Sequence, residues 1–279
     1  MKKISRRSFL AAAGLSVAAL ALTACGGSSA STASSVASSA ASSEAASTSA
    51  AAGELTTVEA GKLTMATNAA FPPYEMTTDA GEFEGIDIET AQAIADKLGL
   101  ELQIDDMDFD AALLSVQQGK ADIVMAGVTV TDERKAVMDF SDNYATGIQS
   151  IIVPEGSDIA SPDDLAGKKI GTQRGTTGYI YCSDDFGDDN VVAYDDGLTA
   201  VQALNNGQVD AVVIDNAPAQ EFVAANPGLK ILDTSYAEED YAIGMAKGSS
   251  LEDAVNATLE ELKADGTLQS IVDKYIKAE

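Results

Sequence analysis

Apolar residues recur along this chain at two spacings, one typical of helices and one typical of short buried strands. Residues 87–98 carry apolar side chains at intervals of three and four and stop at Gly99, which predicts an amphipathic helix. A second predicted helix covers residues 109–118. Short apolar runs around these helices predict strands at residues 63–67, 100–104 and 121–126. Strands that alternate with helices predict an α/β fold, with a largely parallel sheet covered by helices on both faces.

One pattern in this region occurs twice. Residues 112–124 contain a helical stretch, a glycine, an aspartate and a buried strand, and residues 200–212 repeat that order. The order is common in α/β proteins, so it suggests two lobes of similar construction without proving a duplication. In this alignment Gly127 falls opposite Asp215, just past the strand of each lobe. Groups at such positions are suited to bind a ligand in a cleft between the lobes.

The segment after the first copy of the repeat has the composition of a carboxylate receptor. Gly127 and Thr129 follow the strand directly, and Arg134 lies in a charged turn just beyond. A small residue, hydroxyl groups and a guanidinium past the carboxyl end of a strand can together bind a carboxylate. The alternative is a solvated turn, in which Arg134 pairs with Asp132 or Glu133.

Two further segments suit either a binding site or the scaffold. Gln173, Thr176 and Thr177 lie between a predicted strand and a predicted helix, where free backbone N–H groups favour an anion. The same residues also fit a plain strand-to-helix turn. Phe71 follows the first strand and Phe109 opens a helix, so each ring could face a cleft or cover the core. A nucleotide-binding loop is excluded, because neither a Walker motif nor Gly-x-Gly-x-x-Gly occurs.

The start of the chain predicts a lipoprotein signal peptide at residues 1–24. Its basic head precedes an apolar run and contains an Arg-Arg pair, which leaves both twin-arginine and ordinary secretory export open. The residues before Cys25 resemble a bacterial lipobox, in which the signal is cut before this cysteine and its thiol is acylated. Residues 25–53 then predict a flexible tether, because Ser, Ala, Thr and Gly bury too little apolar surface to order a chain.

The composition excludes several classes of function. The chain has 44 acidic and 17 basic residues and a net charge of −27, which argues against nucleic acid and anionic lipid headgroups as partners. It has no histidine, which excludes Ser-His-Asp catalysis and histidine-based zinc motifs. With Cys25 acylated, Cys182 has no disulfide partner, and we expect it to be a small buried side chain. We expect no catalytic residue, no cofactor and no metal, in a monomeric protein.

Several motifs together resemble a known family. They are Ala-Thr-Asn-Ala-Ala-Phe-Pro-Pro-Tyr-Glu at residues 66–75, Gly-Ile-Asp-Ile-Glu at 85–89, and, most specifically, Ala-Gly-Val-Thr-Val-Thr-Asp-Glu-Arg at 126–134. From about residue 62 to 275 the chain resembles the polar amino-acid branch of the extracellular solute-binding proteins, the receptor lipoproteins of ABC importers. Thr90 departs from the family pattern, which usually has an aliphatic residue there, and should affect helix packing only.

The resemblance implies a periplasmic-binding-protein-like fold of two α/β lobes joined by two hinge strands. Lobe 1 would cover residues 59–143 and 244–279, and lobe 2 residues 149–238. The hinges would lie near residues 144–148 and 239–243. A ligand would be held between the lobes.

The resemblance also implies which groups hold the backbone of an amino-acid ligand. Arg134 would bind the ligand's α-carboxylate, with help from Thr129 and the backbone amide of Thr177. Asp215 and the carbonyl of Gly127 would bind the α-ammonium group. This agrees with the placement that the internal repeat suggests, since a zwitterion needs a fixed cation and a fixed anion on opposite walls.

The remaining implied site residues would surround the ligand's side chain. Phe71 and Phe109 would lie on either side of it, and Asn68, Gln173 and Thr176 would line the selective end of the pocket. These three polar groups donate and accept neutral hydrogen bonds, so we expect a neutral polar amino acid.

Two nearby residues bear on this expectation. Ile214 adds an apolar wall, which suits a neutral ligand, whereas Glu75 would favour a cationic one if it turned into the pocket.

We expect the protein to be an extracytoplasmic, lipid-anchored receptor at the outer face of a bacterial cell membrane. It would bind an amino acid and deliver it to the transmembrane subunits of an ABC permease. The alternatives are an enzyme on the same fold, such as a dehydratase acting on a small carboxylic acid, and a sensor domain. The lack of histidine and of a following membrane or kinase segment disfavours both.

Overall fold

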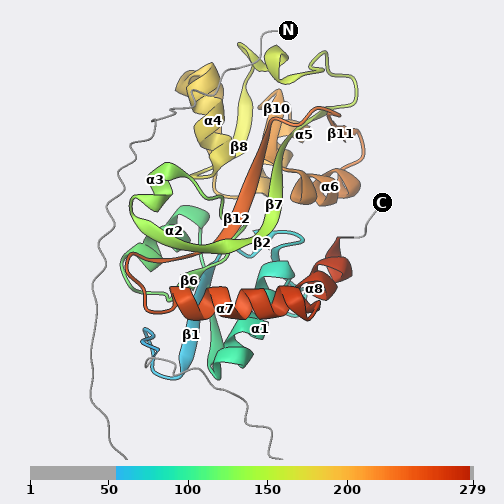
Figure 1. Ribbon diagram of the computed structural model, residues 1–279. Helices are drawn as coiled ribbons and strands as arrows, with labels where there is room; N and C mark the ends of the chain where they lie inside the picture. Colours follow the sequence, from blue (N-terminus) through green and yellow to red (C-terminus); the bar gives the residue numbers. More distant parts are fainter. Residues whose placement is uncertain (1–54, 277–279) are drawn as a thin grey trace, which may run out of the picture. The chain divides into compact units, whose positions relative to one another are not determined.

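The computed structural model describes residues 55–276, which form a mixed α/β fold (Figure 1). The predicted signal peptide, Cys25 and the tether lie outside the described residues. No helix among residues 55–276 is long and apolar enough to cross a membrane. The helices are α1 Ile86–Leu98, α2 Phe109–Gln117, α3 Asp132–Lys135, α4 Thr177–Phe186, α5 Gly197–Asn205, α6 Asn216–Ala225, α7 Glu252–Ala264 and α8 Thr267–Tyr275.

Twelve strands form two sheets in the described part of the chain. Three of them, β2 Ala70–Phe71, β3 Glu75–Thr77 and β4 Phe83–Glu84, make a small antiparallel sheet. The other nine make one large sheet: β1 Lys62–Thr67, β5 Glu101–Asp106, β6 Ile123–Val124, β7 Met138–Pro154, β8 Ile170–Gln173, β9 Val191–Tyr194, β10 Ala211–Asp215, β11 Leu229–Ile231 and β12 Ala237–Ala246.

The predicted elements are present with small shifts at their ends. The helices expected at residues 87–98 and 109–118 are α1 and α2, and Gly99 ends α1 in the left-handed conformation that glycine adopts without strain. The strand expected at residues 121–126 is shorter, because only Ile123 and Val124 form ladder pairs, with β1 and β12.

The large sheet is mixed, so the expectation of a largely parallel sheet was wrong at its centre. Its strand order is β5-β1-β6-β12-β7-β10-β8-β9, with β11 also paired to β7. The outer pairs β1–β5, β1–β6, β8–β9 and β8–β10 are parallel. The two long central strands β7 and β12 pair antiparallel with each other and with their neighbours. They run through the whole fold and connect its two halves (Figure 1).

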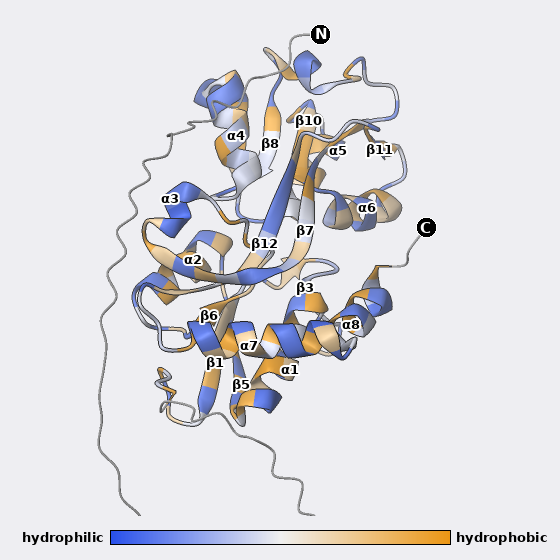
Figure 2. Cartoon of the chain, in the orientation of Figure 1, coloured by the Kyte–Doolittle hydropathy of each residue, from blue (hydrophilic) through white to orange (hydrophobic). Residues whose placement is uncertain are grey.

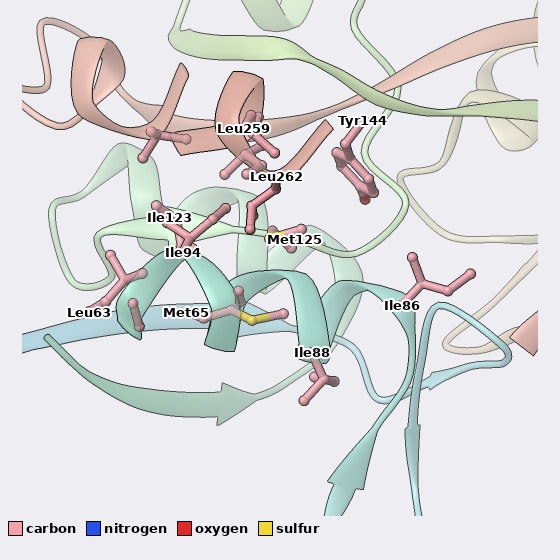
Figure 3. Packing of buried hydrophobic residues seen from close by; sticks show 14 of the residues in the cluster. Leu63, Met65, Ile86, Ile88, Ile94, Ile123, Met125, Tyr144, Leu259 and Leu262 are labelled. Carbon is pink, nitrogen blue, oxygen red and sulfur yellow. The ribbon is translucent and has the colours of Figure 1, made fainter. Parts of the chain in front are cut away.

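We use the term first half for β1–β6, α1–α3, α7 and α8, and second half for β8–β11 and α4–α6. In the first half, successive residues of one strand face opposite sides of the sheet. Leu63 and Met65 of β1 pack under α1, α7 and α8, whereas Ala66 packs against α2. Figure 3 shows Leu259 and Leu262 of α7 in the first of these clusters. Each such fully buried side chain stabilises the fold by about 1.5–3 kcal/mol.

The second half repeats this arrangement. Val212 and Ile214 of β10 pack with α5 and α6, and Val213 packs on the opposite side with Cys182 of α4. Cys182 is fully buried, as expected, and burial raises the pKa of its thiol to about 12. Helices therefore cover both faces of the sheet in each half. Hydrophobic residues mark β10, whereas the outer helix α7 carries both hydrophobic and hydrophilic residues (Figure 2).

Candidate functional site

A cavity that is partly open to solvent lies where the two halves meet at β7 and β12, and the space within it, with the solvent at its mouth included, is about 350 Å³. Nine of the ten predicted ligand-binding residues line it; Gln149, Val213, Ile214 and Tyr241 complete the wall. The full lining is Phe71, Phe109, Gly127, Thr129, Arg134, Gln149, Gln173, Thr176, Thr177, Val213, Ile214, Asp215 and Tyr241.

Arg134 is the buried cation of this cavity. It lies on α3, whose cap Thr131 accepts a hydrogen bond from the Arg134 amide at 3.2 Å. The side chain is 8 % exposed, its guanidinium donates to the carbonyls of Thr129 at 2.7 Å and Gly175 at 3.1 Å, and it lies 5.4 Å from the centre of the Phe109 ring. The solvated turn considered above is therefore wrong. Within the described residues the guanidinium uses two of its five N–H donors, so it has donors left for an anion.

The amino end of α4 adds backbone donors to the same region. Thr176 caps this helix, and its hydroxyl accepts from the Tyr179 amide at 3.3 Å. Thr177 is the first residue of α4, where amides have no partner within the helix. Thr176 and Thr177 both line the cavity. The helix end and Arg134 together make this side of the cavity suitable for a carboxylate.

Asp215 is the acidic residue of the cavity lining. It ends β10 and caps α6, and its two oxygens accept from the amides of Ala217 at 2.9 Å and Ile148 at 2.7 Å. Tyr241 also donates to this carboxyl group. Burial raises the pKa of Asp215 to about 6, although these hydrogen bonds oppose the shift. A carboxylate has about four acceptor positions, so at least one remains for a cation in the cavity.

Gly127 brings its backbone close to two rings of the cavity. Its φ of 54° is left-handed, and a Cβ atom there would lie 2.9 Å from Phe71 and 3.2 Å from Tyr241. Only glycine fits this position without displacing Phe71. The Gly127 amide donates to Asp87 at 3.0 Å.

A pair of buried carboxyl groups lies behind Gly127. Asp87 accepts from Gly127 and, at 2.8 Å, from the Tyr144 hydroxyl. Its other oxygen and both oxygens of Glu75 are buried without a hydrogen-bond donor in the described residues, and the two carboxyl groups lie close enough to affect each other's pKa. Two neighbouring buried carboxyl groups disfavour a second negative charge. Burial raises the pKa of Glu75 well above its usual value and that of Asp87 to about 6. Glu75 thus turns into the core rather than into the cavity lining.

Asn68 is the one predicted site residue that does not line the cavity. Its side chain donates to the Met107 carbonyl at 2.9 Å and accepts from Gln173 at 2.9 Å. Gln173, which does line the cavity, also donates to the Asp195 carbonyl at 3.2 Å. Asn68 therefore positions the side chain of Gln173 through a hydrogen bond that crosses the junction of the two halves.

Glu239, on β12, is a buried acid that the sequence pattern did not reveal. One oxygen, Oε2, accepts hydrogen bonds from the hydroxyls of Thr129 at 3.0 Å and Thr177 at 2.9 Å. It also accepts one from the side-chain amide of Gln149, at 3.0 Å. The side chain is 6 % exposed. Three acids stand in a row at residues 238–240, and only the alternation of a β-strand could have shown that the middle one points inward.

Comparison with known proteins places the chain in a family. Residues 63–278 match the bacterial extracellular solute-binding proteins, family 3. The chain belongs to this family. It is a solute-binding protein and not an enzyme, so the dehydratase alternative is set aside.

Individual relatives agree with this assignment. The L-cystine-binding protein TcyJ of Escherichia coli (strain K12) is 33 % identical over 226 residues, which are 79 % of this chain and 85 % of that protein. An ancestral arginine-binding protein bound to glutamine matches with a TM-score of 0.75 and 42 % identity, over 78 % of this chain and 99 % of the other. The ancestral arginine-binding protein bound to arginine matches with a TM-score of 0.74 and 43 % identity, over 77 % and 98 %.

Proposed function

We propose that this protein captures a free amino acid outside the cell membrane and delivers it to an ABC permease. The observation that carries the proposal is the pair of opposite buried charges, Arg134 and Asp215, in one cavity. An α-amino acid carries a carboxylate and an ammonium group a short distance apart, so it can meet both charges at once. Related proteins bind cystine, glutamine and arginine, which all share these two groups.

The proposed roles follow the hydrogen-bonding capacity of each group. The remaining N–H groups of Arg134 and the backbone amide of Thr177 bind the α-carboxylate. Asp215 and the Gly127 carbonyl bind the α-ammonium group. Burial of these charges is costly unless each is paired, and the bound zwitterion would pair both.

The proposed side-chain preference is for a neutral polar amino acid. Asp215 is the sole acid among the residues that line the cavity, and the ammonium group occupies it. The rest of the wall offers Gln173 and Thr176 as neutral polar groups and Phe71 and Ile214 as apolar ones. A buried lysine or arginine side chain would lack a carboxylate partner there.

We further propose that β7 and β12 act as hinges near residues 144–148 and 239–243, between lobes at residues 59–143 with 244–279 and at residues 149–238. Contacts across the junction of the halves support a closed arrangement: Arg134 to the Gly175 carbonyl, and Gln173 to Asn68. Because these contacts need both halves, they would break on opening and admit the ligand.

The proposed location is the outer face of the cell membrane, with a lipid on Cys25 as the anchor, and the protein is proposed to act as a monomer. Membrane fractionation of a Cys25→Ala variant tests the anchor: this variant should be released, and one that stays with the membrane contradicts it.

A thermal-shift panel of the common amino acids, together with cystine, tests the function. At least one amino acid should raise the melting temperature, with a neutral polar one giving the largest shift. Arg134→Ala should abolish the shift, since loss of a buried charge-assisted contact costs about 2–5 kcal/mol of binding. Arg174→Ala is the matched control, because Arg174 is half exposed and pairs with Asp195 at 3.5 Å. No shift with any amino acid would contradict the receptor function, whereas a largest shift with arginine or lysine would contradict only the neutral preference.

A further inference from the structure

We propose that Glu239 is a positioning residue that fixes the polarity of two hydroxyl groups in the ligand site. The hydroxyls of Thr129 and Thr177 both donate their protons to Glu239. Their lone pairs are then directed to the cavity, where they accept hydrogen bonds from an ammonium group. This inference rests on the proposed amino-acid function and concerns how the site distinguishes an amino acid from the same acid without its amino group.

The first step is a count of protons. A threonine hydroxyl has one proton and two lone pairs, and a carboxylate only accepts. Thr129 Oγ1 lies 3.0 Å and Thr177 Oγ1 2.9 Å from the same Glu239 oxygen. Each hydroxyl therefore donates its single proton to Glu239. The two hydroxyls are 3.4 Å apart and have no second proton to share between them.

The second step concerns what is left for a ligand. Thr129 and Thr177 both line the cavity, but their side chains have no proton for a ligand carboxylate. Their lone pairs suit an N–H donor instead. The carboxylate is then left to the guanidinium of Arg134 and to backbone amides, whereas the ammonium group gains acceptors beyond Asp215. The side chain of Thr129 would thus serve the ammonium group and not, as the family resemblance implied, the carboxylate.

The third step is the fixation of Glu239 itself. Its Oε2 accepts a third hydrogen bond, from Gln149 on β7 at 3.0 Å. The three donors come from both sides of the junction, since Thr129 precedes α3 in the first half and Thr177 opens α4 in the second. Backbone hydrogen bonds from Val130 to Asp240 and from Ala242 to Val128, each 3.1 Å, hold the Thr129 segment along β12. The orientation of the hydroxyls is therefore set by the protein itself once the two halves are closed.

The neighbours of Glu239 provide a matched control. Glu238 and Asp240 flank it on β12, and their side chains are exposed. Replacing Glu238 removes one negative charge from the same strand but leaves the hydrogen bonds of the two hydroxyls intact. Glu239→Gln keeps an oxygen that accepts hydrogen bonds. Glu239→Met keeps the length of the side chain and removes that oxygen.

The test compares an amino acid with its des-amino analogue by isothermal titration calorimetry. The probes are L-glutamine with glutaramate, and L-arginine with 5-guanidinopentanoate. Glu239→Met should weaken binding of the amino acid about tenfold or more relative to binding of its analogue. The two hydroxyls are then no longer oriented, and their hydrogen bonds to the charged ammonium group of the ligand are lost. Glu239→Gln should keep the ratio of the two affinities within about threefold of wild type, and Glu238→Met should leave both affinities unchanged.

Three outcomes would overturn the proposal. They are an unchanged affinity ratio in Glu239→Met, an equal loss for amino acid and analogue, and a Glu239→Gln variant as impaired as Glu239→Met. If Glu239→Met does not fold, Thr129→Val decides, and it should weaken the amino acid about tenfold more than the analogue. Equal weakening there also overturns the proposal. A wild-type protein that binds no amino acid at all would instead contradict the proposed function.

Discussion

The affinity of the receptor for its amino acid should depend on pH through Asp215. The pKa of this carboxyl group is raised to about 6 by burial. A bound ammonium group favours the ionised form and lowers that pKa. Binding therefore selects the deprotonated form and releases a proton wherever Asp215 is protonated beforehand. The affinity should therefore fall as the pH drops below about 6, and it should be nearly constant above about pH 7.

The size of this effect follows from the fraction of Asp215 that is ionised. One pH unit below a pKa, about one carboxyl group in eleven is ionised, which makes binding at pH 5 about tenfold weaker than at pH 7. This factor corresponds to about 1.4 kcal/mol. Asp87 also has a pKa raised to about 6, but it does not line the cavity and hydrogen-bonds to Gly127 and Tyr144, so it should not contribute to the slope in affinity.

Calorimetry with L-glutamine at pH 5, 6, 7 and 8 measures this dependence, because glutamine does not titrate in that range. Repeating each titration in two buffers of different ionisation enthalpy counts the protons released. Asp215→Asn should weaken binding by about 2–5 kcal/mol and abolish the slope below pH 6. An affinity that stays flat from pH 5 to 8, or a slope that survives in Asp215→Asn, would refute the reasoning.

Two further predictions concern the core and the junction. Glu75 is buried with a raised pKa, so the folded state holds a proton that the unfolded chain loses above its ordinary pKa of about 4.5. Glu75 should therefore make stability in urea decline by up to about 1.4 kcal/mol per pH unit as the pH rises from that value towards its folded pKa. Glu75→Gln should make the decline shallower and leave the part that the raised pKa values of Asp87 and Asp215 produce up to about pH 6. A decline that is unchanged in Glu75→Gln would show that Glu75 is ionised in the fold. X-ray scattering should give a smaller radius of gyration once the amino acid found by thermal shift is added, since the ligand pairs charges on both halves. An identical curve at saturation would argue against hinged closure.

Much of the fold was predictable because its elements carry strong local patterns. The helices α1 and α2 show regular apolar spacing, Gly99 caps α1 and Gly119 follows the cap of α2, and β1 and β10 are mainly apolar. The central strands β7 and β12 carry no such signal. β12 contains three consecutive acids, and β7 alternates only in part, since it crosses from one core to the other. Their antiparallel pairing joins residues about a hundred positions apart, which local pattern cannot reveal.

The same limit applies to the site. Gly127, Arg134 and Asp215 could be found because they end strands or follow them, and the internal repeat aligned those positions. Glu239 and Gln149 lie inside long strands, where burial of a polar residue depends on pairing across the sheet. Asn68 was expected in the pocket, but whether an amide faces a cavity or the residue behind it depends on side-chain packing, which the order of residues leaves open.

The path of the chain through the two halves has a consequence for the order in which the protein can fold. The core of the first half combines β1 and α1, near the start of the described chain, with α7 and α8 at its end. The second half is instead built from one continuous stretch between β7 and β12. Contacts between neighbours in sequence form faster than those that must close a long loop. The second half can thus acquire its core before the first half has docked α7 and α8, the last helices of the described chain.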